Sequence, residues 1–189
     1  MPSNYERERL IGAIAYFAKH TEHCGLTKIY KLLSFLDFEH YKAVGQSVTS
    51  LGYKAWDRGP LPPALDNEIK NGVKPDMAAV LRFEQHPYAN DKEFYKVVVT
   101  NLPDNYLDYF SPRQKKIMKS LAEKHKYDTA DQMVKTSHES DRPWHRVWVE
   151  QKRKYEEIPY DYVIPDQGED KDFIDLVKIE NGEIRLNFG

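Results

Sequence analysis

The stretch from Thr27 to Val44 constrains the fold most, because apolar residues cover nearly all of its circumference. At helical spacing it carries Ile29, Leu32, Leu33 and Leu36, and the aromatic residues Phe35, Phe38 and Tyr41 widen that stripe. A helix that is apolar on most sides needs neighbours packed around it. We therefore expect a central buried helix, with Thr27 as its N-cap. We expect it to end at Gly45, because glycine adopts the left-handed terminal conformation without a steric cost.

The chain after this helix predicts a rigid corner. Residues 47–56 mix β-branched and aromatic side chains with polar ones, which is typical of a short strand and the loop before it. The sequence Arg58-Gly59-Pro60-Leu61-Pro62-Pro63 follows. Proline disfavours a helical conformation in the residue before it and fits the first turn of a helix. We therefore place the corner at Gly59 and start the next helix at Pro62 or Pro63.

Local signals predict further helices. Apolar residues at helical spacing favour one helix from Arg9 to His20. The sequences Ser111-Pro112-Arg113-Gln114 and Thr129-Ala130-Asp131-Gln132 each fit a capping box, in which the first and fourth residues satisfy each other's backbone amides. A last helix is expected to run from Trp144 to about Tyr155, with its tryptophans on one face.

Two runs rich in β-branched and aromatic residues, 80–85 and 93–100, predict a hairpin. Together with the short strand near Tyr53, this hairpin predicts one small antiparallel sheet beside the helices. The expected fold class is therefore α+β, with a mainly helical domain around the central helix.

The chain changes character at Ile158. Prolines and a run of acidic residues predict an extended linker, and Asn181-Gly182 between two alternating runs predicts a C-terminal β-hairpin over residues 175–188. We therefore divide the chain into a domain of residues 1–157 and an extension of residues 158–189. The hairpin can pack onto its own domain or accept a strand from a partner, and the sequence leaves both possibilities open.

Composition narrows the class of partners. The 189 residues include 28 Lys and Arg against 30 Asp and Glu, a net charge of −2, which argues against a nucleic-acid binder that depends on a basic excess. The single cysteine, Cys24, excludes an internal disulfide and fits a reducing compartment. The chain lacks a secretory signal pattern, and no apolar run approaches the roughly 18 residues that span a bilayer. We therefore expect a cytoplasmic protein with no membrane partner.

One group of residues raises the possibility of a metal site or an acid–base pair. Asp37 and His40 lie three residues apart on one helix face, and His138 with Glu139 could join them. The spacing matches no compact metal signature. A buried Asp37–His40 hydrogen bond that fixes the helix to its neighbours uses the same residues, and we favour this structural role. The sequence predicts no catalytic residue, metal ion or cofactor.

Two other features favour structural roles as well. Pro143-Trp144 follows His138 closely, and this fits a tight bend closed by an aromatic ring better than a coordination shell. Lys31 belongs to the central helix and needs a partner, because an unpaired buried charge is very costly. We expect that partner to be Glu68 or Glu139.

The order of several short motifs resembles the Panacea domain of SocA-like antitoxins, over roughly residues 4–148. The matching residues are Lys31-Leu32-Leu33, Asp37, His40, Gly45, Val48-Thr49, Tyr53, Ala55, Gly59-Pro60-Leu61-Pro62, Ser137-His138-Glu139 and Pro143-Trp144. The sequence departs from the family pattern at Ser34, Leu36, Gln46-Ser47 and Ser50, where the family often has Tyr, Ala, Arg-Pro and Gly.

The resemblance implies an antitoxin that neutralises a toxin encoded next to it by direct binding. Relatives in the family are adaptors that deliver a toxin to a protease, so a protease or chaperone is a possible further partner. We expect steric masking of the toxin, with contacts from Tyr53, Trp56, Arg58 and Leu61, and structural roles for the motif residues. An alternative of another class is a small metal-dependent enzyme that uses Asp37, His40, His138 and Glu139.

Overall fold

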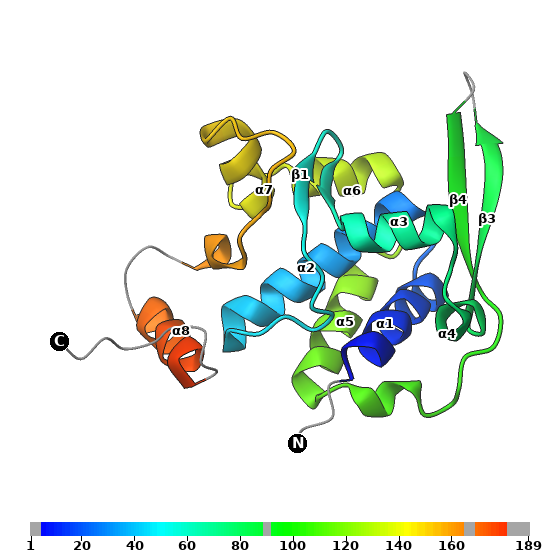
Figure 1. Ribbon diagram of the computed structural model, residues 1–189, viewed down its shortest axis with the longest axis horizontal. Helices are drawn as coiled ribbons and strands as arrows, with labels where there is room; N and C mark the ends of the chain where they lie inside the picture. The colour runs from blue at the N-terminus through cyan, green and yellow to red at the C-terminus, as the bar shows by residue number, and fades with distance from the viewer. Residues whose placement is uncertain (1–4, 89–91, 165–168, 181–189) are drawn as a thin grey trace.

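The computed structural model describes residues 5–88, 92–164 and 169–180 (Figure 1). Helices form one body around α2 (Leu26–Val44), and two short antiparallel hairpins lie against that body, so the predicted α+β class is confirmed. Gly45 ends α2 with a φ of 70°, as expected. The N-cap is Gly25, which makes no side-chain cap, and Thr27 lies inside the first turn. The prediction of a Thr27 cap is therefore wrong by two residues.

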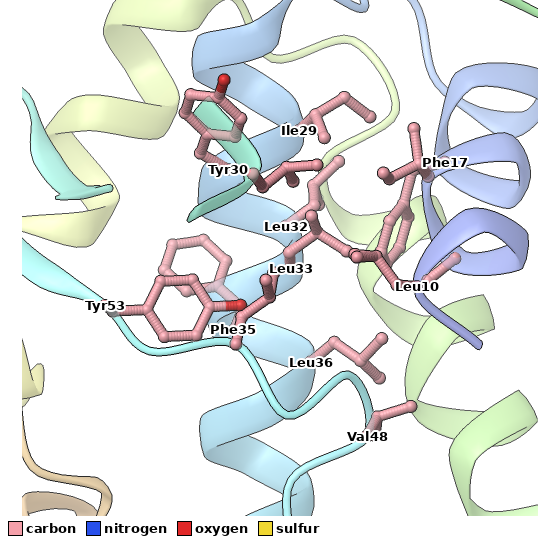
Figure 2. Close-up of a cluster of buried hydrophobic side chains, with 14 of the residues drawn as sticks. Leu10, Phe17, Ile29, Tyr30, Leu32, Leu33, Phe35, Leu36, Val48 and Tyr53 are labelled. Atoms are coloured by element: carbon pink, nitrogen blue, oxygen red, sulfur yellow. The ribbon is translucent and has the colours of Figure 1, made fainter. Parts of the chain in front are cut away.

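Three helices pack around α2: α1 (Glu6–His20), α5 (Pro112–Lys124) and α6 (Ala130–Ser137). Their inner faces meet the apolar stripe of α2, and Figure 2 shows Leu32 of α2 directed towards Phe17 and Leu10 of α1. Both predicted capping boxes are confirmed. Ser111 accepts the Gln114 amide at 3.3 Å, and Thr129 accepts the Gln132 amide at 3.4 Å.

Further helices complete the described fold. They are α3 (Pro63–Asn71), α4 (Pro75–Ala78), η1 (Tyr106–Tyr109), α7 (Pro143–His145), the π-helix η2 (Arg146–Glu150), η3 (Tyr160–Val163) and α8 (Glu169–Glu180). The helix predicted to reach Tyr155 ends at Glu150. Lys152 and Tyr155 have φ values of 55° and 65°, which a continuous right-handed helix does not permit. Among the described residues, no helix is long and apolar enough to cross a membrane.

The strands form two separate sheets, which corrects the prediction of one sheet. The first pairs β1 (Lys54–Trp56) with β2 (Gly59–Leu61), and the second pairs β3 (Leu81–Tyr88) with β4 (Lys92–Val99). The chain reverses direction at residues 57–58, just before the corner predicted at Gly59, and Gly59 is the first residue of β2. Residues 155–158 cover the other edge of β1. The Ala55 amide and carbonyl both hydrogen-bond to the backbone of this segment, and the Ile158 amide donates to the Tyr53 carbonyl.

The C-terminal extension also differs from the prediction. Helix α8 occupies the residues expected to form the first strand of the C-terminal hairpin, so that part of the prediction is wrong. The apolar residues Phe173, Leu176 and Ile179 are three positions apart, which fits one face of a helix. This spacing is as good a helix signal as the alternation of apolar and polar residues from 175 onward is a strand signal. The expected second strand lies outside the described residues.

Residues 158–164 pack on α2 and do not form the predicted extended linker. Ile158 and Ile164 are buried, and the Tyr160 ring lies 5.0 Å from Phe38 and 5.1 Å from Tyr41 between ring centroids. The aromatic ring of Tyr160 therefore fixes the start of the extension to the central helix.

Leu33→Ala should lower the free energy of unfolding by about 2–5 kcal/mol, because Leu33 is fully buried and the cavity cannot close completely. Urea denaturation followed by circular dichroism measures this change. Leu176→Ala is the matched control, since Leu176 is 61% exposed on α8 and should change stability little. Equal effects of the two substitutions would contradict this account of the core.

Candidate functional site

Asp37 binds the loop that follows α2. Its buried carboxylate accepts the backbone amides of Val48 and Thr49, both at 2.8 Å, and the hydroxyls of Thr49 and Tyr53. Burial raises the pKa of Asp37, and these four donated hydrogen bonds oppose that shift because they stabilise the charged form. The contacts fix residues 48–53 against the central helix.

His40 binds a neighbouring point of the same loop. Its Nδ1 lies 2.6 Å from the Gln46 carbonyl oxygen, and burial lowers the pKa of His40. Asp37 and His40 therefore share a helix face, but each contacts the loop and not the other. The predicted hydrogen bond between them is wrong, because loop donors already surround the Asp37 carboxylate. In the same loop Ser50 has a φ of 56°, a conformation that suits the glycine common in the family pattern.

Lys31 binds a backbone carbonyl in place of the predicted carboxylate. Its Nζ donates to the Pro60 carbonyl at 2.7 Å, and burial, with a smaller effect of the Arg58 charge, lowers the pKa of Lys31 to about 7. The predicted partners are engaged elsewhere: Glu68 pairs with Arg7 at 2.6 Å, and Glu139 lies 3.9 Å from the Arg142 Nε. Lys31 thus ties β2 to α2.

Gly59 is required by this contact. Its φ is +93°, and a Cβ added there would lie 2.6 Å from the Lys31 Cε and would overlap the Ser137 hydroxyl. Pro60 and Leu61 continue β2, and Pro62 is the N-cap of α3. The Gly-Pro motif therefore lets β2 approach both α2 and the end of α6.

His138 and Trp144 attach the next segment to the same hairpin. Their rings stack at 3.6 Å with an interplanar angle of 8°, and the Trp144 Nε1 donates to the Trp56 carbonyl at 2.8 Å. Burial lowers the pKa of His138 to about 4, and the Lys31, Arg58 and His145 charges act in the same direction. His138 is therefore neutral at pH 7 and presents a ring without charge to the indole.

Two further motif residues lie at the start of this segment. Pro143 is the buried first residue of α7, while the Glu139 side chain is 54% exposed. The structure thus brings together Lys31, Gly59, Pro60, His138 and Trp144 around the β1–β2 hairpin. It places Asp37 and His40 at the adjoining loop and Glu139 at the surface.

An aromatic surface lies over this hairpin. We define it by Trp56, Trp148 and Tyr155. The Tyr155 ring packs edge-on against both tryptophans, at 4.8 Å from Trp56 and 5.4 Å from Trp148. Trp56 is 40% exposed and Tyr155 is 45% exposed. Lys154 lies 4.8 Å above the Trp148 ring, and the Tyr155 hydroxyl donates to Asp57.

The four residues expected at a partner contact divide between surface and core. Trp56 and Arg58 are exposed, with Arg58 paired to Asp131 at 2.7 Å, and Leu61 is half-buried on β2. Tyr53 is only 1% exposed and donates to Asp37, so its prediction as a surface contact is wrong. Tyr53 directly precedes β1, and its ring packs against Phe38 of α2 and against Tyr160, which accounts for its burial.

Sequence reasoning missed the partly buried Trp148 and the exposed Tyr155 as members of this surface, because both were placed in one helix. The basic run Lys152-Arg153-Lys154, whose three residues are all exposed, was the available signal that the helix ends before Tyr155. The two positive φ values in this loop turn the Tyr155 ring back onto Trp56.

The residues of the alternative enzyme do not meet. Asp37 and His40 face the loop after α2, His138 stacks on Trp144, and Glu139 is at the surface. Within the described ranges, no group of three or more His, Cys, Asp or Glu side chains could hold a metal ion. The geometry therefore offers these four residues no common site.

Comparison with known proteins identifies the family. The family model described as antitoxin SocA-like, Panacea domain, matches residues 29–145, more than half of the chain. The chain belongs to this family. No curated protein and no solved structure matches it. The matched residues include all but the first three residues of α2, the β1–β2 hairpin and the His138–Trp144 stack, so the Panacea match covers the buried contacts that position the aromatic surface.

Gly59→Ala should lower the free energy of unfolding by about 2 kcal/mol or more, since alanine strains the backbone at this φ and its methyl group overlaps Ser137 and Lys31. Thermal denaturation measures the loss. Gly52→Ala is the control in the preceding loop, because a Cβ there meets nothing within 4 Å. Similar melting temperatures for the two variants would refute the close approach at Gly59.

The buried Lys31 should make stability depend on pH. Its folded pKa of about 7 lies below the ordinary value of 10.5, so between these values the unfolded chain binds more protons and stability rises with pH. Lys31 can raise the free energy of unfolding by up to about 1.4 kcal/mol for each unit of pH. Lys31→Met removes this group, so the stability of the natural chain relative to the variant should increase as pH is raised above about 7. Parallel stability curves for the two proteins would count against a neutral Lys31 at high pH.

Proposed function

We propose that the protein is an antitoxin that binds a toxin encoded next to it and masks the toxin's active surface with the aromatic surface Trp56–Trp148–Tyr155. Membership in the SocA-like antitoxin family supports the role. The observation that carries the placement is the exposed pair Trp56 and Tyr155, held edge to face over a hairpin that buried contacts fix to α2.

The aromatic surface has the properties of a binding hot spot. Aromatic side chains dominate the affinity of protein interfaces when their rings are buried by the partner. Trp56 is fixed through its backbone carbonyl by Trp144, and Tyr155 is fixed through its hydroxyl by Asp57. Because these groups are ordered before binding, little conformational entropy is lost when a partner covers them.

Polar and aliphatic side chains surround this centre. Arg58 pairs with the highly exposed Asp131, and Leu61 extends the surface along β2. Exposed ion pairs contribute little to stability within one chain. Arg58 can therefore exchange Asp131 for a carboxylate on the toxin at small cost.

The first experiment is growth of cells that express the adjacent reading frame, with and without this chain. Under the proposal the chain restores growth, the two proteins purify as a complex, and the toxin level is unchanged. A fall in toxin level that depends on a protease would identify an adaptor instead. A harmless neighbouring protein, or rescue without any complex, would refute direct neutralisation.

The double substitution Trp56→Ala and Tyr155→Ala should raise the dissociation constant for the toxin at least about 30-fold, which corresponds to about 2 kcal/mol lost from the centre of the interface. Titration calorimetry with purified toxin measures the change, and circular dichroism verifies the fold. Tyr127→Ala is the control, because Tyr127 is 69% exposed on the connection between α5 and α6. Unchanged affinity in a folded double variant would show that the contact lies elsewhere.

A further inference from the structure

The β3–β4 hairpin has one covered edge and one open edge. The Val97 amide of β4 donates to the Cys24 carbonyl at 3.0 Å, and β4 packs against α1 and α2. Strand β3 lies on the other side of the hairpin, away from the helical body (Figure 1). An eight-residue strand with an open edge is a template for pairing with another strand.

The register shows which groups of β3 face outward. Thr100 donates to the Val80 carbonyl, so residues 80 and 100 form a hydrogen-bonded pair next to the ladder that starts at Leu81 and Val99. Hydrogen-bonded and non-hydrogen-bonded pairs alternate along antiparallel strands. Even-numbered residues of β3 therefore bond to β4. Leu81, Phe83 and Gln85 direct their amides and carbonyls outward, and no described residue hydrogen-bonds to these groups.

The side chains on the open edge favour one register of self-pairing. Arg82 and Glu84 share the solvent face of β3 and form an ion pair at 2.8 Å, with 64% and 32% of their side chains exposed. In an antiparallel pair of two β3 strands centred on Phe83, each Arg82 lies opposite the Glu84 of the other copy. Directly opposed opposite charges stabilise a sheet, whereas opposed like charges destabilise it.

Neighbouring registers are poorer. Centring on Arg82 places two arginines opposite each other, and centring on Glu84 places two glutamates opposite each other. Centring on Gln85 puts Phe83 opposite Pro87, which has no amide to donate. Only the register centred on Phe83 pairs the outward amides and carbonyls of Leu81, Phe83 and Gln85 with each other and alternates charge across both strands.

We propose that two copies of this chain pair antiparallel along β3, centred on Phe83, to form one four-stranded sheet from two hairpins. Residue 83 of each copy hydrogen-bonds to residue 83 of the other, and residues 81 and 85 bond reciprocally. Pro87 lies beyond these bonds and ends the ladder. This assembly is independent of the aromatic surface.

Substitutions that exchange the charges of residues 82 and 84 test whether β3 is the dimer contact and whether the pairing is centred on Phe83. In Arg82→Glu every opposed pair is Glu with Glu, and in Glu84→Arg every opposed pair is Arg with Arg. A mixture of the two variants opposes Glu with Arg at both places. We expect the natural chain to sediment with twice the mass of one chain, each variant alone to sediment as a monomer, and the mixture to form a heterodimer that a tag on one variant retains.

The heterodimer also verifies that both variants fold. Lys116→Glu is the matched control, because it makes the same charge change as Arg82→Glu at an exposed position of α5 and should leave the dimer intact. A natural chain that is monomeric at all concentrations overturns the proposal. So does a dimer that persists in Arg82→Glu, or a mixture of folded variants that stays monomeric. A further outcome also overturns the proposal. If the natural chain is monomeric and Arg82→Glu loses toxin binding, the open edge of β3 pairs with a strand of the toxin and not with a second copy.

Discussion

The position of the candidate binding surface depends on the buried polar side chains of α2. Lys31, Ser34 and Asp37 are spaced three residues apart and lie on one face of α2, whose buried residues are mostly apolar. Lys31 holds the β2 carbonyl of Pro60, Ser34 bonds back to the Lys31 carbonyl, and Asp37 holds the loop before β1. Hydrogen bonds depend on direction and distance, so these contacts set the register of the hairpin more strictly than apolar packing can.

Burial of Lys31 without a carboxylate has a physical cost that the fold reduces in two ways. The lowered pKa means that the amine can lose its charge near neutral pH, and both the charged and the neutral amine can donate a hydrogen bond to the Pro60 carbonyl. The His138 ring is neutral at pH 7, since its pKa is lowered to about 4 by burial and by the Lys31 charge. The group of motif residues thus avoids a second positive charge near Lys31.

Features that depend on a few neighbouring residues were predictable from the sequence. The two capping boxes and the left-handed Gly45 follow from local chemistry, and the apolar circumference of residues 27–44 sufficed to place the central helix. The partner of Lys31 was not predictable, because every residue carries a backbone carbonyl and the residue type at position 60 does not show which carbonyl accepts the bond. The end of the π-helix was missed since Lys152 adopts a positive φ without being a glycine.

The errors at the C-terminal end and at Tyr53 have a common origin. Residues 175–180 fit both a strand and a helix, and their environment decides between the two. Tyr53 lies in an aromatic stretch that suits a surface or a core. Its burial follows from residues 155–158, which cover β1 from about a hundred positions away. Contacts of such large sequence separation are not visible in a pattern of neighbouring residues.

The central helix supports both proposed surfaces at different places. Lys31 and Asp37 hold the β1–β2 hairpin from the middle of α2, whereas the residues at its start, Cys24 and Gly25, pair with β4. Figure 1 shows the β3–β4 hairpin on the opposite side of the helical body from α7. Two copies joined along β3 would therefore leave each aromatic surface uncovered. The proposed dimer thus places its contacts away from the surface that we propose for the toxin.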